Sequence, residues 1–164
     1  MSLVPYRRLA RGFTLIEVLV VCALVAVTLG LAMIKLDPSD SQRLNAAAEM
    51  LAGRLEAARD EAVIRGETVA FSSDGQGYQF WVADTERNAW VALPDADTLV
   101  SGRLAAGVML SAQRVNGRPR PLGERLVFSF SGLVEAFSLT LSAGSTTLDI
   151  QADALGRINI HRAP

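Results

Sequence analysis

The sequence predicts an α+β fold in which a long N-terminal helix is packed on a domain of two antiparallel β-sheets. Three observations lead to this prediction. An apolar run extends from Phe13 to Ile34, which is about the 20 residues that a helix needs to cross a bilayer. Residues 44–62 repeat apolar side chains at helical spacing. From Glu67 onward the period changes to two, and glycine-containing turns recur.

The N-terminal segment combines a basic leader with an apolar helix. Residues 1–12 carry no acidic residue and three arginines, Arg7, Arg8 and Arg11. The chain is then uncharged from Val18 to Ile34, and Glu17 is the single carboxylate beside this run. Because an ionised carboxylate at the centre of a bilayer costs about 2.5 kcal/mol or more, Glu17 is a candidate functional residue.

Two ordinary explanations compete for this segment. A secretory signal peptide has a shorter apolar core followed by a small-residue cleavage site, whereas this run ends in Ile34-Lys35-Leu36-Asp37-Pro38 without such a site. A plain signal anchor would leave Glu17 without a role. The leader arginines, against Lys35 on the other flank, place the N-terminus in the cytoplasm by the positive-inside rule. We therefore expect a leader over residues 1–12 and a membrane-spanning helix over residues 13–35.

A second, amphipathic helix is predicted over residues 36–66. Asp37-Pro38 is a typical helix start, and Gly66 is a typical helix end. One face is apolar, at spacings of three and four residues: Leu44, Ala48, Leu51, Leu55, Ala58 and Ala62. This face predicts a helix that packs on the core of one globular domain.

Residues 67–164 are predicted to form a β-rich domain. Val69 and Phe71 alternate before the turn at Asp74-Gly75-Gln76-Gly77, and the alternation resumes at Tyr78, so a hairpin is expected there. Further short strands are expected, with Pro119 and Pro121 in a loop or on an edge strand: 89–93, 108–110, 126–130, 136–141, 147–152 and 157–160. Seven or eight short strands in under 100 residues indicate two packed antiparallel sheets with the helix on one side.

The residue inventory argues against catalysis and against a cofactor. His161 is the single histidine and Cys22 the single cysteine, so a zinc site and an intramolecular disulfide are both excluded. Ser72 and Ser73 precede Asp74 without a nucleophile motif. Asp95 and Asp97 alone do not make a calcium loop. We therefore expect no enzyme activity, no cofactor and no metal.

Charge argues against nucleic acid in general, with one local exception. The formal charge of −1 becomes −4 without the three leader arginines, so no global field attracts DNA. The exception is the segment from Arg114 to Arg125, whose four arginines offer the single patch suited to phosphates: Arg114, Arg118, Arg120 and Arg125. As a run of loop charges, it is expected to be solvated.

The motif Gly12-Phe13-Thr14-Leu15-Ile16-Glu17 resembles the N-terminal signature of type IV pilins and of the pseudopilins of type II secretion. The stretch Leu55–Gly66 is similar to the end of the stalk helix in H-type minor pseudopilins, Asp74–Phe80 to their first hairpin, and Gly156-Arg157-Ile158 to their last strand.

This resemblance implies a pilin-like, structural and non-catalytic subunit. A prepilin peptidase would cut between Gly12 and Phe13 and methylate the new α-amine of Phe13. The mature protein would be a single-pass inner-membrane protein with a periplasmic domain. The resemblance further implies assembly with other major and minor pseudopilins on an inner-membrane secretion platform, in a filament that exports folded proteins across the outer membrane. There Glu17 would pair with the Phe13 α-amine of a neighbouring subunit.

A related group offers an alternative function. Minor pilins of type IV pili are similar in the same motif, and one is implicated in DNA uptake, which would use the segment from Arg114 to Arg125. The first proline after the apolar run is Pro38, and this departure from the usual proline position in pilins favours the secretion version.

Overall fold

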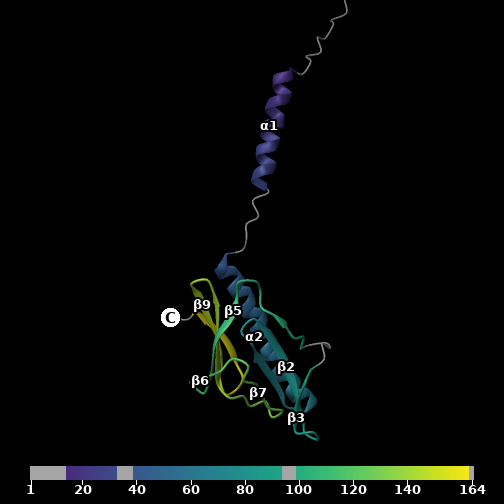
Figure 1. Cartoon of the computed structure of the whole chain (residues 1–164), viewed down its shortest axis with the longest axis vertical. Helices are drawn as coiled ribbons and strands as arrows, with labels where there is room; N and C mark the ends of the chain where they lie inside the picture. The colour runs from purple at the N-terminus through teal and green to yellow at the C-terminus, as the bar shows by residue number, and fades with distance from the viewer. Residues whose placement is uncertain (1–13, 33–38, 94–98, 163–164) are drawn as a thin grey trace, which may run out of the picture. The chain divides into compact units, whose positions relative to one another are not determined.

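The computed structural model describes residues 14–32, 39–93 and 99–162 (Figure 1). The chain forms two compact units, Met1–Asp37 and Pro38–Pro164. In the first unit, helix α1 spans Leu15–Ala32. Among the residues that the structure describes, no helix is both long and apolar enough to cross a membrane.

The second unit begins with helix α2, Asp40–Arg65. Ser39 is its N-cap: the Gln42 N–H donates to Ser39 Oγ at 3.3 Å, and the Ser39 N–H donates to Gln42 Oε1 at 3.1 Å. This reciprocal capping box satisfies two backbone donors, and it explains why the helix starts at Asp40 and not directly after Asp37, which lies outside the described residues. Gly66 ends the helix in the left-handed region at φ 67°, as its position in the sequence predicts.

The first sheet is built on the predicted hairpin. Its strand order is β3-β2-β1-β7, and β4 pairs with β2 at the end of β2 that β3 leaves free. The strands are β1 Val69–Ser73, β2 Gly77–Asp84, β3 Ala89–Ala92, β4 Gly102–Arg103 and β7 Leu126–Phe128. All the pairings are antiparallel.

The second sheet has the order β10-β9-β8-β5-β6 and is also antiparallel. Its strands are β5 Met109–Val115, β6 Arg118–Arg120, β8 Phe137–Ala143, β9 Thr146–Ala152 and β10 Ile158–Arg162. Asn116 and Gly117 form the β5–β6 turn with φ of 51° and 75°, as the sequence predicts. Pro119 lies in β6, and β6 is an edge strand, where proline leaves the rest of the ladder intact.

Two strands differ most from the expectation. β4 is two residues long and was not predicted, because a pairing so short has no periodicity to detect. β5 is longer than the predicted 108–110 and runs to Val115. It contains a register shift between Leu110 and Ala112, which breaks the simple alternation of buried and exposed positions.

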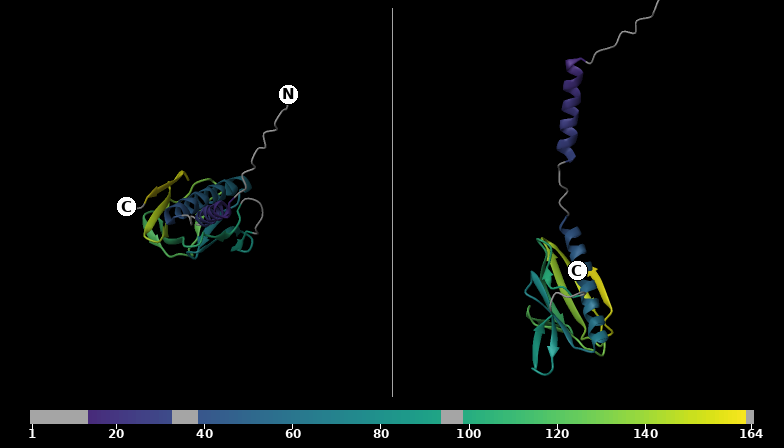
Figure 2. Two further views of the ribbon diagram at one scale, coloured as in Figure 1. Left: turned by 90° about the horizontal axis from the view of Figure 1, so that it is seen from above. Right: turned by 90° about the vertical axis from the view of Figure 1, so that its right-hand side faces the viewer.

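The core lies between α2 and the two sheets. The apolar face of α2 contacts strands of both sheets, and β10 lies beside the helix (Figure 2). Fully buried side chains come from all three layers: Leu44, Leu51 and Leu55 of α2, Phe71, Phe80 and Phe128 of the first sheet, and Leu139, Leu141 and Ile150 of the second. The predicted α+β class with two antiparallel sheets is confirmed.

Candidate functional site

Glu17 lies in the first turn of α1. Its backbone N–H donates to the carbonyl of Thr14 at 3.0 Å and to Thr14 Oγ1 at 3.3 Å, so Thr14 closes the start of the helix. A carboxylate in the first turn interacts favourably with the helix dipole. The Glu17 side chain is exposed, so it is accessible to a group from another molecule.

The side chains around Glu17 are apolar and exposed. Leu15 is 84% exposed, Ile16 72% and Leu19 61%. Exposed apolar residues continue along the described part of α1 on all its sides, including Leu24 and Val27. A helix that is apolar all round is stable when lipid or other helices surround it. This property identifies α1 as the part of the chain that requires an apolar environment.

Several predicted residues lie outside the described ones. They are the cleavage pair, the leader arginines and the two carboxylates of the acidic loop: Gly12, Phe13, Arg7, Arg8, Arg11, Asp95 and Asp97. Cys22 lies in α1 and is exposed.

The serine-rich hairpin serves the turn and has no catalytic arrangement. Ser73 donates its hydroxyl to the Gly77 carbonyl at 2.6 Å and accepts the Gly75 N–H at 3.1 Å. Asp74 Oδ1 accepts the N–H groups of Gly77 at 2.6 Å and Gln76 at 2.9 Å. The Gly77 N–H is the main reason that the pKa of the Asp74 carboxyl is lowered, followed by the Gln76 N–H. Both serine and aspartate are therefore engaged in closing the hairpin.

A cavity of about 480 Å³ lies beside this hairpin. Its lining includes Tyr78, Gln79, Ser101 and Arg103. The lining also includes Ser73 and Asp74, whose side chains the hydrogen bonds of the hairpin already engage.

Three arginines of the Arg114–Arg125 segment lie on two paired strands of the second sheet, and the fourth contacts the first sheet. Arg114 lies on β5, whereas Arg118 and Arg120 lie on the edge strand β6. Arg120 forms an ion pair with Glu124 at 2.9 Å. The guanidinium carbon of Arg125 lies 4.4 Å from the ring centre of Trp81 and 5.7 Å from that of Trp90. Both tryptophans belong to the first sheet. This cation–π contact between distant strands was not foreseeable, because it requires the strand order.

No group of three or more His, Cys, Asp or Glu side chains suited to a metal occurs among the described residues. His161 is exposed on the edge strand β10. Its nearest neighbour across the ladder is Asp149 of β9. Asp149 already accepts a hydrogen bond from Thr140 Oγ1 at 2.6 Å.

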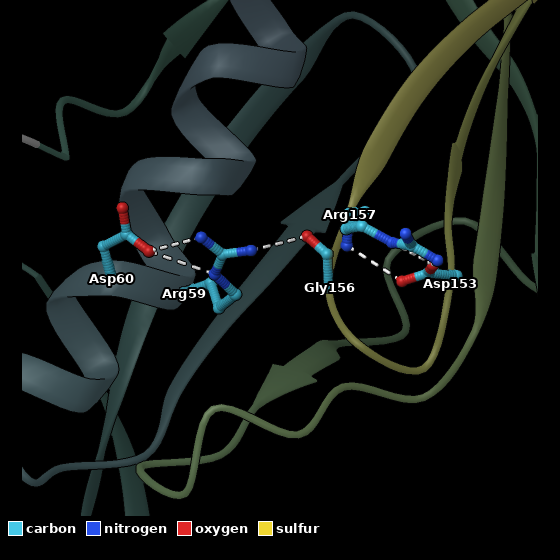
Figure 3. A network of polar contacts seen from close by, with 5 residues as sticks. All are labelled: Arg59, Asp60, Asp153, Gly156 and Arg157. Carbon is cyan, nitrogen blue, oxygen red and sulfur yellow. Dashed lines mark hydrogen bonds and ion pairs between the residues drawn. The ribbon is translucent and has the colours of Figure 1, made fainter.

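A polar network joins α2 to the turn between β9 and β10 (Figure 3). Arg59 Nη1 donates to the Gly156 carbonyl at 2.7 Å, and the same guanidinium pairs with Asp60. Within the turn, Asp153 accepts the backbone N–H of Arg157 at 2.9 Å and pairs with its side chain at 2.8 Å. Gly156 has φ 72°, and an added Cβ would lie 2.7 Å from Arg59 Cδ. The network therefore requires glycine at this position.

Two family models match the chain. The model of type II transport protein GspH matches residues 47–156, and the prokaryotic N-terminal methylation motif matches residues 7–33. The curated type II secretion system protein H of Pseudomonas aeruginosa is 35% identical over 85 residues, which cover 51% of this chain. The chain spans about half the length of this relative, 49%.

Solved structures share the fold. The minor pseudopilin EpsH of the Vibrio cholerae type 2 secretion system superposes with a TM-score of 0.60 at 17% identity, covering 73% of this chain and 97% of that one. Escherichia coli GspH superposes with a TM-score of 0.60 at 19% identity, covering 80% of this chain and 95% of that one. The type IV minor pilin FimU of Pseudomonas aeruginosa superposes with a TM-score of 0.51 at 22% identity, covering 74% of this chain and 88% of that one. At these identities the likeness concerns the fold alone.

Proposed function

Because the chain belongs to the family of type II transport protein GspH, the H-type minor pseudopilins, we propose that it serves as a structural, non-catalytic subunit of a type II secretion pseudopilus. The observation that carries this proposal is the match of the family model over residues 47–156. This range runs from the first half of α2 to the turn before β10, and so covers most of the folded domain.

The family and its methylation motif imply an inner-membrane anchor and a periplasmic domain. The specific topology belongs to the proposal: residues 13–35 span the inner membrane, the N-terminus faces the cytoplasm and the domain from α2 onward lies in the periplasm. The exposed apolar side chains of α1 and the basic leader support this arrangement.

Processing is the next step of the proposal. A prepilin peptidase cuts between Gly12 and Phe13 and methylates the α-amine of Phe13. The match of the methylation motif to residues 7–33 supports this step, because the motif encloses the cleavage pair. Thr14 then becomes the second residue of the mature chain, and Glu17 the fifth.

Glu17 is the proposed assembly determinant. In a bundle of apolar helices its carboxylate pairs with the Phe13 α-amine of a neighbouring subunit. Both charges are costly in a low-dielectric bundle when unpaired, so the register that joins them is favoured over the others. The exposure of Glu17 beside Leu15 and Ile16 supports this role, because a neighbour has access to it.

Family membership implies association with other pseudopilins of the secretion system. The proposed partners are the major and minor pseudopilins of one filament, together with the inner-membrane secretion platform. DNA uptake is not favoured, because Arg125 is engaged with the ring of Trp81 and Arg120 with the carboxylate of Glu124.

A deletion and complementation assay tests the proposal. Cells that lack this chain should retain exoproteins in the periplasm, and the full-length chain should restore their release into the medium. Release at the wild-type level without the chain, combined with salt-dependent DNA binding by the purified protein, would overturn it in favour of the pilus function.

A further inference from the structure

Three adjoining cavities surround the tip of the β1–β2 hairpin. The cavity of about 480 Å³ shares Arg103 with a second cavity of about 380 Å³, and Asp74 with a third of about 310 Å³. The second and third cavities share Gln76 and Met109. Because they have walls in common, the three lie side by side and offer room for a ligand of several linked units. They are called the hairpin cavities below, and the largest of them the main cavity.

The main cavity lies on the face of the first sheet that is turned away from the core. Successive side chains of a strand point to opposite faces of the sheet. Phe71 and Phe80 are buried in the core, so their neighbours Ser72 and Gln79 point to the other face, where β1 and β2 pair them with each other. Both are half-buried and line the main cavity. A hydroxyl and an amide therefore lie next to each other in its wall.

Ser101 adds a second hydroxyl to this wall. Its Oγ is buried and has no hydrogen-bond partner among the described residues, although the residue lines the main cavity. Ser101 directly precedes β4, whose Gly102 pairs with Tyr78 of β2, so it lies beside the strand that carries Gln79. Buried polar atoms in native proteins nearly always have a partner. A ligand in the main cavity would supply the bond that Ser101 lacks.

The three polar side chains both donate and accept hydrogen bonds. Trp81 Nε1 donates to Ser72 Oγ at 2.8 Å, so Ser72 retains its own hydroxyl hydrogen for a ligand. The amide of Gln79 has two N–H donors and an acceptor oxygen, and the hydroxyl of Ser101 has one donor hydrogen and two lone pairs. A ligand rich in hydroxyl groups matches this set, because each of its groups also donates and accepts.

The charges in the main cavity favour a neutral ligand. Asp74 and Arg103 both line it. The N–H groups of Gly77 and Gln76, and to a lesser extent the charge of Arg103, lower the pKa of the Asp74 carboxyl. The carboxylate and the guanidinium therefore attract each other and leave no net charge to select an anion or a cation.

An extended peptide fits the main cavity less well. Peptides commonly bind by adding a strand to a free sheet edge. In this sheet β2 is paired with β1 along one edge and with β4 and β3 along the other. The strand that carries Gln79 therefore lacks the free edge that a peptide would need.

We propose that the hairpin cavities bind a short neutral oligosaccharide, whose hydroxyl groups contact Ser72, Gln79 and Ser101 in the main cavity. A sugar ring also has an apolar C–H face. Met109, Leu110 and Leu122 line the third cavity and offer a surface for such a face. Volumes of about 300–1,000 Å³ are typical of small-molecule sites, which the main cavity satisfies. This binding is a function in addition to the proposed one and does not depend on it.

Titration of the full-length chain, purified in a detergent without a sugar headgroup, tests the inference. The probes are cellotetraose and chitotetraose, two neutral tetrasaccharides that differ in their acetamido groups. We expect at least one of them to bind with a Kd of about 1 mM or tighter. A tetrapeptide of alternating serine and alanine should bind at least tenfold more weakly. Failure of both sugars to bind at concentrations tenfold higher would overturn the inference.

Substitutions locate the binding. Gln79→Ala combined with Ser101→Ala should weaken the affinity for the bound sugar at least tenfold, because both side chains line the main cavity. Asn159→Ala is the matched control, since Asn159 is an exposed amide on β10 of the other sheet, and it should leave the affinity unchanged. Ser101→Ala alone should not lower the thermal unfolding midpoint, because the hydroxyl that it removes has no partner among the described residues.

Three other results would contradict the inference. They are an unchanged sugar affinity in the double variant, tighter binding of the tetrapeptide than of either sugar, and a lowered unfolding midpoint for Ser101→Ala. The last result would show that the hydroxyl serves the fold. Exoprotein release by cells that lack the chain tests the proposed function separately, so the failure of one is distinguishable from the failure of the other.

Discussion

Two aspartates act at chain reversals in the same way. Asp74 closes the β1–β2 turn, and Asp153 closes the β9–β10 turn, each by accepting backbone N–H groups. The backbone N–H of Arg157, and then its guanidinium, lower the pKa of the Asp153 carboxyl below its ordinary value of 3.8. These bonds favour the ionised carboxylate in the folded chain.

The domain should therefore lose stability in acid. A carboxyl with a lowered pKa in the folded state stabilises the fold fully above its unfolded pKa, and this contribution is lost as the pH falls through the folded pKa. We expect the thermal unfolding midpoint to decrease between pH 5 and pH 2, and Asp153→Asn to flatten part of that decrease. An identical pH profile for the wild type and the Asp153→Asn variant would contradict this role.

A single glycine should control processing. Gly12→Ala adds a Cβ where the peptidase approaches the backbone, and we expect the protein to remain at its unprocessed mass in the inner membrane. Mass spectrometry of the wild type should give an N-terminus at Phe13 with one added methyl group. Ala10→Ser, two residues upstream, should be processed normally. A wild-type N-terminus after Ile34 would instead indicate an ordinary signal peptide.

Residues whose role depends only on their neighbours in the sequence could be identified from the sequence alone. Glu17 was identified because it is a carboxylate beside a long apolar run, and Gly66 because it follows a helical repeat. Arg125 was grouped with Arg114, Arg118 and Arg120 by proximity in sequence, but it lies over Trp81 on the first sheet. Tertiary contacts of this kind depend on strand order, which single-sequence patterns do not determine.

At the scale of elements, a hydrogen bond joins α2 to the β9–β10 turn of the second sheet. Arg59 reaches from the helix to the Gly156 carbonyl, and the turn is closed on itself by Asp153 (Figure 3). The Gly156-Arg157-Ile158 motif is therefore explained by packing, since Gly156 needs both a positive φ and space for the Arg59 side chain.

Gly156→Ala should destabilise the domain by about 1–3 kcal/mol, because it combines backbone strain with displacement of Arg59. Gly66→Ala is the matched control: Gly66 also has a positive φ of 67°, but nothing lies within 4 Å of its added Cβ. Chemical denaturation of both variants measures the difference. Equal losses of stability would show that the contact with Arg59 contributes nothing.

Edge strand β6 gives a second test at this scale. Replacing Arg114, Arg118 and Arg120 with Ala should leave exoprotein release near the wild-type level, because these side chains are solvated and Arg125 keeps its contact with Trp81. Purified wild-type protein should show no strongly salt-dependent DNA affinity. Micromolar DNA binding that weakens with each lost arginine would support the pilus alternative.

Regular elements were more predictable than their ends. The β1–β2 hairpin follows from alternation around a glycine-rich turn, and it appears as expected. The described part of α2 begins at Asp40, where Ser39 and Gln42 form a capping box, and the Asp37-Pro38 signal lies outside the described residues. β4 and the extension of β5 depend on pairing partners distant in sequence and so left no local pattern.

For the whole molecule, the chain divides its tasks between two units. The first carries exposed apolar side chains and, in its described helix, the carboxylate of Glu17, which suits assembly in a bundle of helices. The second buries its own core between α2 and two sheets. The proposed function assigns both tasks to one subunit of a pseudopilus.

Secretion by cells that carry Glu17→Leu in place of the wild-type chain tests the central claim most directly. The substitution removes a charge that costs about 2.5 kcal/mol or more in the bilayer, so membrane insertion should be retained while the pairing with Phe13 is lost. We expect normal amounts of inner-membrane protein with strongly reduced exoprotein release and filament incorporation. Release and incorporation at wild-type levels, with the protein correctly inserted, would contradict the account.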